Sequence, residues 1–272
     1  MLIRLADAPP LVIAAYRLSL ASLILAPLGL ARAAPEFRAL SHRDLVFAGL
    51  SGIFLAVHFA FWITSLSHTS VASSVVLVTI NPIFVGIASH FLTGDRLTRE
   101  TLIGIALAIA GAVIIGYGDW GIGWGAFWGD VLALLGALAV AGYYLIGRRL
   151  RRRVSLLAYA SLAYVTAALV LLALAVANGD SLQGYSGQTY LMFILLALVP
   201  QLLGHTSLNW ALRYVSATLV SIAVLGEPVG ATILAYLVLG EVPTPPEIGG
   251  GALILAGVYI AFRARATPRS AG

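Results

Sequence analysis

Nine apolar segments, each long enough to cross the hydrocarbon core of a bilayer, occupy most of this sequence. The connections between them are mostly about four to eight residues long, so neighbouring segments must run antiparallel. Because 60% of the residues are hydrophobic and only 10% are charged, a water-soluble core could not cover this much apolar surface. The sequence therefore predicts an all-α polytopic membrane protein with nine spans. We place them at residues 8–31, 45–66, 71–92, 99–117, 125–147, 155–177, 188–210, 216–239 and 247–263.

The residue types that are missing exclude several kinds of chemistry. The chain has no cysteine, which excludes disulfides, thiolate metal sites and cysteine nucleophiles. All 16 basic residues are arginine, so a Walker-type nucleotide site and a lysine Schiff base are excluded as well. We therefore expect no cofactor and no bound metal.

The arginines are distributed very unequally between the two sides of the predicted membrane. When alternate connections are assigned to opposite sides, one side has Arg4 alone, and Arg17 lies within the first span. Such an asymmetry predicts that the arginine-rich side, with the C-terminus, is cytoplasmic. The net charge of +5 then reflects topology, and since the basic connections lack interleaved aromatic residues we expect no nucleic-acid partner. The arginine-rich side collects Arg32, Arg38, Arg43, Arg96, Arg99, Arg148, Arg149, Arg151, Arg152, Arg153, Arg213, Arg263, Arg265 and Arg269.

Residues 65–114 are repeated at residues 211–260 without a gap, and 13 of the 50 aligned positions are identical. The identities include a mid-helix proline, a turn glycine followed by an acid, and a pair of glycines seven residues apart. Five spans separate the two copies, an odd number, so the copies must face opposite ways in the membrane. Inverted repeats are typical of secondary transporters, with the substrate site between the halves. We also expect the two glycine-bearing helices, 99–117 and 247–263, to pack together.

The repeat divides the chain into a first unit of four spans, residues 1–117, and a second unit of five spans, residues 125–263. Residues 264–272 then form a cytoplasmic tail. The first unit lacks a partner for span 125–147, so we expect a helix before residue 1, of which residues 1–3 are the tail and residues 6–10 the outer turn. The alternative is a protein that works with nine helices.

Four stretches carry a resemblance to a known family. The segments "ADAPPLVIAAYRLSLASLIL", "GDVLALLGALAVAGYYLIGRRL", "VLGEPVGATILAYLVLGE" and "GIALAIAGAVII" resemble the EamA-type drug/metabolite transporters in order and spacing. The resemblance implies a ten-helix fold of inverted five-helix repeats, here with the first helix missing. It also implies export of small metabolites across the bacterial inner membrane. The segment from His58 to Trp62 is most similar to bacterial exporters of aromatic and other amino acids.

Two prolines lie in the middle of matching spans, in the pairs Asn81-Pro82 and Glu227-Pro228. A proline frees the carbonyl four residues earlier and bends the helix. The carbonyl could bind a substrate ammonium group, or the bend could serve packing alone. An ionisable group in mid-span suggests function. Glu227 could carry a proton, pair with a cationic substrate group, or pair permanently with Arg17.

The remaining polar and aromatic residues within the spans suggest a moderately polar substrate pocket. Planar apolar faces with a few hydrogen-bonding groups would suit an amphipathic substrate. We interpret Asp130 differently, as a capping residue whose carboxylate interacts favourably with the helix dipole near the start of its helix. The predicted substrate-binding residues are Tyr16, Arg17, His58, Trp62, Asn81, His205, Trp210 and Glu227.

The predicted function is that of a secondary active or facilitative exporter of small metabolites, including aromatic amino acids, working by alternating access. Its partners would be a small-molecule substrate, the lipid bilayer and, if Glu227 or His58 carries one, a proton. We expect a monomer or a weak homodimer, and no enzyme activity. The alternatives are an intramembrane enzyme, a transporter of another solute class such as cationic drugs or nucleotide sugars, and a membrane scaffold without transport.

Overall fold

The computed structural model describes residues 2–69, 71–92, 98–116, 123–227, 229–230, 237 and 245–266, which form helices and their connections. No strand occurs within these ranges. The helices are α1 (Leu2–Leu5), α2 (Pro10–Ala39), α3 (His42–Ser65), α4 (Val71–Thr79), α5 (Asn81–Leu92), α6 (Arg99–Gly116), α7 (Gly123–Arg151), α8 (Leu156–Ala177), α9 (Gly187–Leu196), the π-helix η2 (Ala197–His205), α10 (Thr206–Ala211), α11 (Ala217–Val224) and α13 (Pro245–Ala266).

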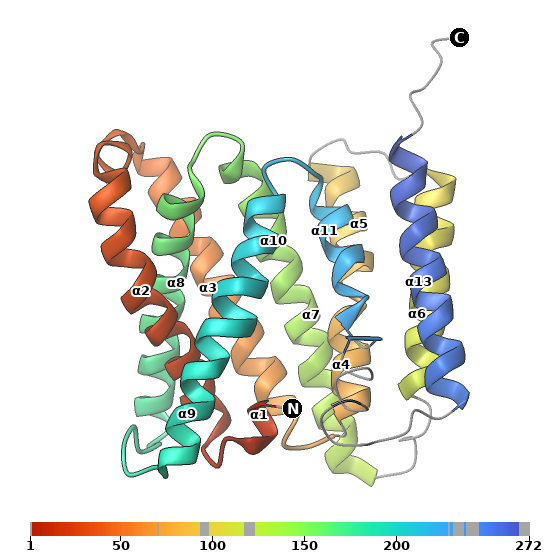
Figure 1. Cartoon of the computed structure of the whole chain (residues 1–272), viewed down its shortest axis with the longest axis horizontal. Helices are drawn as coiled ribbons and strands as arrows, with labels where there is room; N and C mark the ends of the chain where they lie inside the picture. Colours follow the sequence, from red (N-terminus) through yellow and green to blue (C-terminus); the bar gives the residue numbers. More distant parts are fainter. Residues whose placement is uncertain are drawn as a thin grey trace.

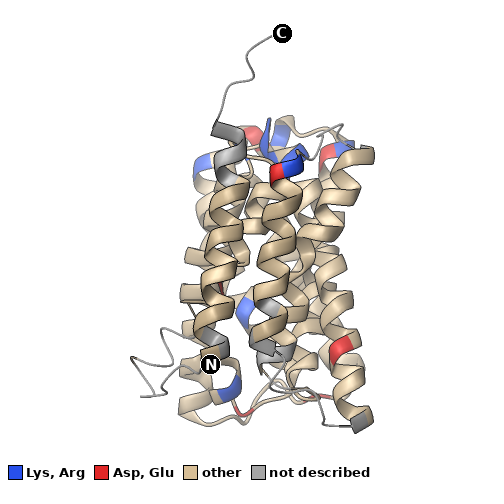
Figure 2. Ribbon diagram, turned by 90° about the vertical axis from the view of Figure 1, so that its right-hand side faces the viewer, with Lys and Arg blue, Asp and Glu red and all other residues tan. Residues whose placement is uncertain are grey.

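The helices lie side by side and run alternately up and down, so the connections gather at two ends of the molecule (Figure 1). The connections after α2, α7 and α10 lie at the end of the molecule where α13 finishes at Ala266. Most basic residues also gather at that end (Figure 2), as the positive-inside pattern predicts. The two ends therefore differ in charge in the way a membrane protein requires.

Six described helical segments are long and apolar enough to cross a membrane. Each of the nine predicted spans coincides with at least one helix, but part of segment 216–239 lies outside the described residues, so the count of nine remains a prediction. The tail beyond residue 266 lies outside them as well. A shorter apolar helix covers Ile248–Ala261. The six segments are Pro10–Ala39, His42–Ser65, Ser74–Phe91, Trp124–Arg151, Leu156–Ala177 and Gly187–Ala211.

Four of the helices begin at a serine whose hydroxyl accepts a hydrogen bond from the backbone N–H three residues later. These N-caps satisfy donors that the first helical turn leaves free, and so fix where each helix starts. Asp130, predicted near a helix start, lies instead about two turns inside α7, which begins at Gly123; that prediction is wrong. The capping residues are Ser41, Ser155, Ser186 and Ser216.

Helices α6 and α13 pack closely against each other through their glycines, as the sequence predicts (Figure 1). A Cβ atom built on Gly104 would lie 2.5 Å from the backbone oxygen of Gly257, and one built on Gly111 would collide with that of Gly250. Only glycine permits this separation of the two backbones. The two helices form a pair at one side of the bundle.

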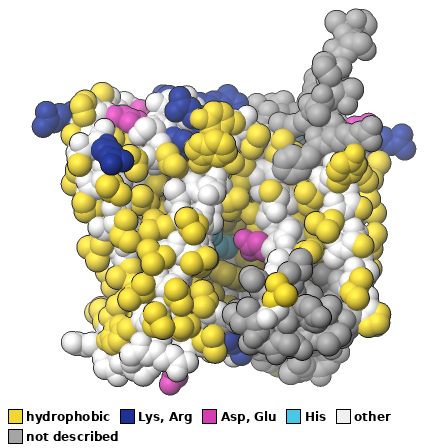
Figure 3. Space-filling view, in the orientation of Figure 1, with side chains coloured by type: hydrophobic (Ala, Val, Ile, Leu, Met, Phe, Trp, Pro, Cys, Tyr) yellow, Lys and Arg dark blue, Asp and Glu magenta, His cyan; other side chains and the backbone are white. Residues whose placement is uncertain are grey.

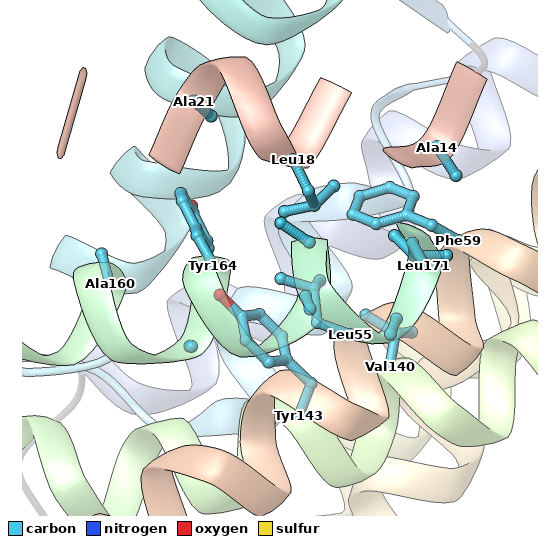
Figure 4. Packing of buried hydrophobic residues seen from close by; sticks show 14 of the residues in the cluster. Ala14, Leu18, Ala21, Leu55, Phe59, Val140, Tyr143, Ala160, Tyr164 and Leu171 are labelled. Atoms are coloured by element: carbon cyan, nitrogen blue, oxygen red, sulfur yellow. The ribbon is translucent and has the colours of Figure 1, made fainter. Parts of the chain in front are cut away.

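The main core fills the space between α2, α3, α7 and α8 (Figure 4). Phe59, Tyr143 and Tyr164 are fully buried there, among leucine, valine and alanine side chains. Alanines and Gly52 let the helices approach, because a Cβ on Gly52 would lie 2.6 Å from the backbone oxygen of Ala163. This packing fixes one wall of the interior of the bundle.

The arginine-rich end is tied together by contacts between its connections. Asp44, at the start of α3, forms an ion pair with Arg153, and Glu36 of α2 accepts a hydrogen bond from the backbone N–H of Ser155. Both contacts join the connection between α2 and α3 to the one between α7 and α8.

Candidate functional site

Arg17 is a buried cation in the second turn of α2, with 2% of its surface exposed. Its Nε–H donates a hydrogen bond of 2.8 Å to Oε1 of Gln201. Its guanidinium carbon lies 4.1 Å from the ring centroid of Phe59, in a cation–π contact. Among the described residues no carboxylate forms a direct ion pair with Arg17, and a charged residue inside a membrane bundle is costly and marks a functional site.

Gln201 belongs to the π-helix η2, and Pro200 explains why the helix changes type there. Proline has no N–H, so the α-helical hydrogen bond to Leu196 cannot form, and the chain widens into π-helical turns at this point. With more than four residues per turn, Gln201 and His205 lie on nearly the same face. Single π-helical segments are frequent at functional sites. The π-helix was not among the predicted features, although Pro200 in mid-span is a sequence signal for it.

An aromatic wall lies beside Arg17. The rings of His58 and Trp62 stack with centroids 5.8 Å apart, and His205 lies 5.1 Å from Phe59 and 6.3 Å from His58. Nδ1 of His58 donates to the carbonyl oxygen of Gly136 at 2.9 Å, which orients the imidazole. The wall is thus built by α3 and η2 together.

Glu227 lies just beyond α11, and its surface is exposed. It interacts electrostatically with both Arg17 and Tyr144, yet it forms no direct ion pair with Arg17. Figure 3 shows a hollow at mid-height of this face, in which an acidic side chain and a histidine are visible. The permanent Arg17–Glu227 pair that the sequence left open is therefore not formed, and Gln201 takes the place next to the guanidinium.

Several polar atoms around the site are buried and have no hydrogen-bond partner among the described residues. An unpaired buried polar group costs about 1–3 kcal/mol, so each of these atoms is available to bind a ligand or a water molecule. Three of them belong to the site just described: Nε1 of Trp62, Nε2 of Gln201 and Nδ1 of His205.

Two predicted site residues have other roles. Tyr16 donates to the carbonyl oxygen of Leu182 at 2.6 Å and stacks on Phe193, which anchors the connection before α9. Trp210 is 54% exposed on the outside of α10 and contacts Tyr214. The structure brings neither of them to the aromatic wall.

Asn81 lies at the break between α4 and α5. Pro82 cannot donate to the carbonyl oxygen of Val78, and Nδ2 of Asn81 donates to it instead, at 3.1 Å. The carbonyl predicted to be free is therefore occupied by a side chain of its own helix. Pro228 and the matching bend lie outside the described residues.

A buried hydrogen-bond network lies behind η2. Tyr143 donates to Oδ1 of Asn209 at 2.8 Å, the amide of Asn209 donates to the hydroxyl of Tyr164 at 3.1 Å, and that hydroxyl bonds to Thr206 at 3.1 Å. Thr206 in turn donates to the carbonyl oxygen of Gln201 at 3.3 Å. The network therefore holds the π-helix against α7 and α8 and fixes the position of Gln201.

Comparison with known proteins identifies this arrangement as that of a transporter. The model of the EamA-like transporter family matches residues 1–117 and 127–263. A solved crystal structure shares the fold with a TM-score of 0.79 and 22% sequence identity, covering 96% of this chain and 90% of that one.

Two of the relatives are named for the export of amino acids or their metabolites. A "Probable terminal-alkyne amino-acid exporter" of Streptantibioticus cattleyicolor is 28% identical over 72% of this chain. A "Probable amino-acid metabolite efflux pump" of Salmonella typhimurium is 30% identical over 67% of it. The chain spans 65% of the length of each of these two relatives. Because the family model matches nearly the whole length of this chain, the chain belongs to the EamA-like transporter family, whose members are multi-pass membrane proteins.

Proposed function

We propose that this protein is a secondary active or facilitative exporter of small metabolites, amino acids including aromatic ones, that works by alternating access. The observation that carries the proposal is the buried guanidinium of Arg17, which has aromatic rings beside it and Glu227 within electrostatic reach. A charged group in mid-span is retained where it binds a substrate or an ion. The names of the two amino-acid exporters among the relatives support the same substrate class.

We further propose that the two halves, residues 1–117 and 125–263, are inverted repeats with the site between them. The opposite directions of α3 and of the segment from α9 to α10 in Figure 1 support this arrangement. So do the two separate segments matched by the family model. Because Arg17 and Phe59 come from the first half and Gln201 and His205 from the second, movement between the halves would open and close the site.

The membrane orientation follows from the charges. We place the arginine-rich end and the C-terminus in the cytoplasm of a bacterial cell, with the protein in the inner membrane. No lysine occurs in the chain, so a Walker-type site for nucleotide hydrolysis is excluded, and the driving force would be the substrate gradient or an ion gradient.

Counterflow in proteoliposomes tests the proposal. Vesicles loaded with an unlabelled amino acid should accumulate the same labelled amino acid from outside, and vesicles without protein should not. The panel should include phenylalanine, tryptophan, leucine, glutamate and lysine, together with a cationic drug. Uptake of the drug alone would reject the amino-acid assignment, and the absence of any flux from folded protein would reject transport.

A further inference from the structure

The guanidinium of Arg17 has hydrogen-bonding capacity to spare. Arginine carries five N–H donors in a planar fork. The one on Nε is used by Gln201, and no hydrogen bond to a described residue engages the four on the terminal nitrogens. One face of the guanidinium is covered by the ring of Phe59. The terminal edge of the fork is therefore the part available to a ligand.

Gln201 is oriented so that its amide N–H groups are also available. Nε of Arg17 can only donate, so the atom of Gln201 that faces it must be the oxygen; the reversed amide would set two donors against each other. Nε2 of Gln201 consequently points away from Nε of Arg17. It is buried and forms no hydrogen bond of normal geometry in the part of the chain that the structure describes, although one of its N–H groups interacts with the hydroxyl of Tyr164. The second N–H group of the amide remains for a ligand. A fully buried amide with an unused donor beside a guanidinium is a built recognition element.

The unused donors of the site define the chemistry of the group that would satisfy them. Arg17 and Gln201 offer N–H groups, and the indole N–H of Trp62 is a third buried donor without a partner in the described residues. Such a site requires an anion with several lone pairs. A planar carboxylate matches the edge of a guanidinium with two parallel hydrogen bonds.

Glu227 distinguishes a carboxylate from a phosphate. Its carboxyl group lies within electrostatic reach of Arg17 and, when ionised, opposes a dianion bound to the guanidinium. A ligand with one carboxylate and one ammonium group leaves the net charge of the site unchanged, because each ligand charge meets one protein charge of opposite sign. This balance matters in a membrane interior, where an uncompensated charge is expensive.

We propose that the site recognises the free carboxylate of an α-amino acid through Arg17 and Gln201, while Glu227 receives its ammonium group. The inference rests on the proposed transport function and specifies the substrate as a free zwitterion. The rings of Phe59, His58 and Trp62 lie beside the carboxylate position and accept an apolar or aromatic side chain. Amino-acid amides and amines, which lack the carboxylate, should therefore bind more weakly.

The test compares ligands that differ only in the proposed contact. L-phenylalanine, L-phenylalanine amide and 3-phenylpropanoate are measured for their ability to raise the thermal unfolding temperature of the purified protein. They are also measured as competitors of labelled phenylalanine in counterflow. We expect phenylalanine to bind about tenfold to a hundredfold more tightly than its amide, since the amide leaves the guanidinium edge without an anion. The propanoate should be intermediate.

The variant Gln201→Glu supplies a permanent carboxylate next to Arg17. It should fold, because the new group pairs with the guanidinium, and it should bind phenylalanine no better than the amide. Arg17→Lys keeps the charge but not the fork, and should reduce the preference for phenylalanine over its amide. Trp210→Phe, on the outer surface, is the matched control and should behave as the native protein does.

Two results would overturn the inference. The first is that every amino acid tested, including phenylalanine, raises the unfolding temperature of the native protein by the same amount as its own amide does. The other is an unchanged preference in Gln201→Glu, with its native fold verified by helical circular dichroism. Both results are measured by ligand binding, so they are distinguishable from failure of the transport proposal. If only the transport proposal failed, ligands with a carboxylate would still stabilise the protein, but no flux would be measured.

Discussion

Replacing Gly104 by alanine should loosen the contact between α6 and α13. The added Cβ would lie 2.5 Å from the backbone oxygen of Gly257 and 2.8 Å from the Cβ of Ala261, whereas ordinary contacts begin at 3.4 Å. Neither partner can rotate away, because one belongs to the backbone and the other is attached to it directly. The helices must therefore separate locally by close to 1 Å. Overpacking of this kind costs about 1–3 kcal/mol.

Reversible unfolding of the purified protein in mixed detergent micelles measures this cost. Gly49→Ala in α3 is the matched control, because a Cβ at Gly49 meets no atom within 4 Å. That substitution should be neutral, or should stabilise the protein by about 0.5–1 kcal/mol through the higher helix propensity of alanine. If Gly104→Ala were as stable as Gly49→Ala, the close approach of the two backbones would be refuted.

The double substitution of Gly104 and Gly257 gives a second check of the same contact. Each added Cβ would press on the backbone of the other helix, and one separation of the helices relieves both clashes. The double variant should therefore be destabilised by less than the sum of the two single variants, by about 0.5–1 kcal/mol or more. Strict additivity would place the two glycines in independent contacts.

Three further substitutions test other parts of the structure. Asn81→Leu leaves the carbonyl oxygen of Val78 without its donor and should lower the free energy of unfolding by about 1–3 kcal/mol. Ser41→Ala removes the N-cap of α3 and should cost about 1 kcal/mol in the same assay, whereas an effect as small as that of an exposed serine would contradict the cap. Glu227→Gln should abolish any dependence of phenylalanine counterflow on an imposed pH gradient if Glu227 carries the proton. A dependence left intact would assign the proton to another group.

The helices were predictable because each depends on local information. An apolar run of about twenty residues specifies a span, and serines such as Ser155 and Ser216 specify where helices begin. The contact between α6 and α13 was predictable from glycine spacing alone. Asp130 was misplaced because α7 begins at Gly123, about two turns earlier than the sequence indicated.

The site was less predictable because it depends on which face each residue occupies. Adjacent residues differ by about 100° around a helix, and Tyr16, next to Arg17, contacts Leu182 and Phe193 instead of the site. His205 and Trp210, five residues apart, differ by about 140° in an α-helix, which explains why Trp210 lies outside. Gln201 was missed because a neutral amide in an apolar run gives no signal; its role follows only from the hydrogen bond to Arg17.

The tightly packed helices and the interrupted helices lie in different parts of this fold, and their positions suggest how the two halves would move during transport. The crossing of α6 and α13 is symmetric in sequence: shifted by the repeat interval, Gly104 becomes Gly250 and Gly111 becomes Gly257, so the two contacts exchange. Such a tightly packed pair resists deformation. The π-helix η2 and the break between α4 and α5, in contrast, interrupt the backbone ladder in mid-span. Because α6 belongs to the first half and α13 to the second, we expect their close contact to persist as the pivot while the halves move and η2, which carries Gln201, separates from Arg17.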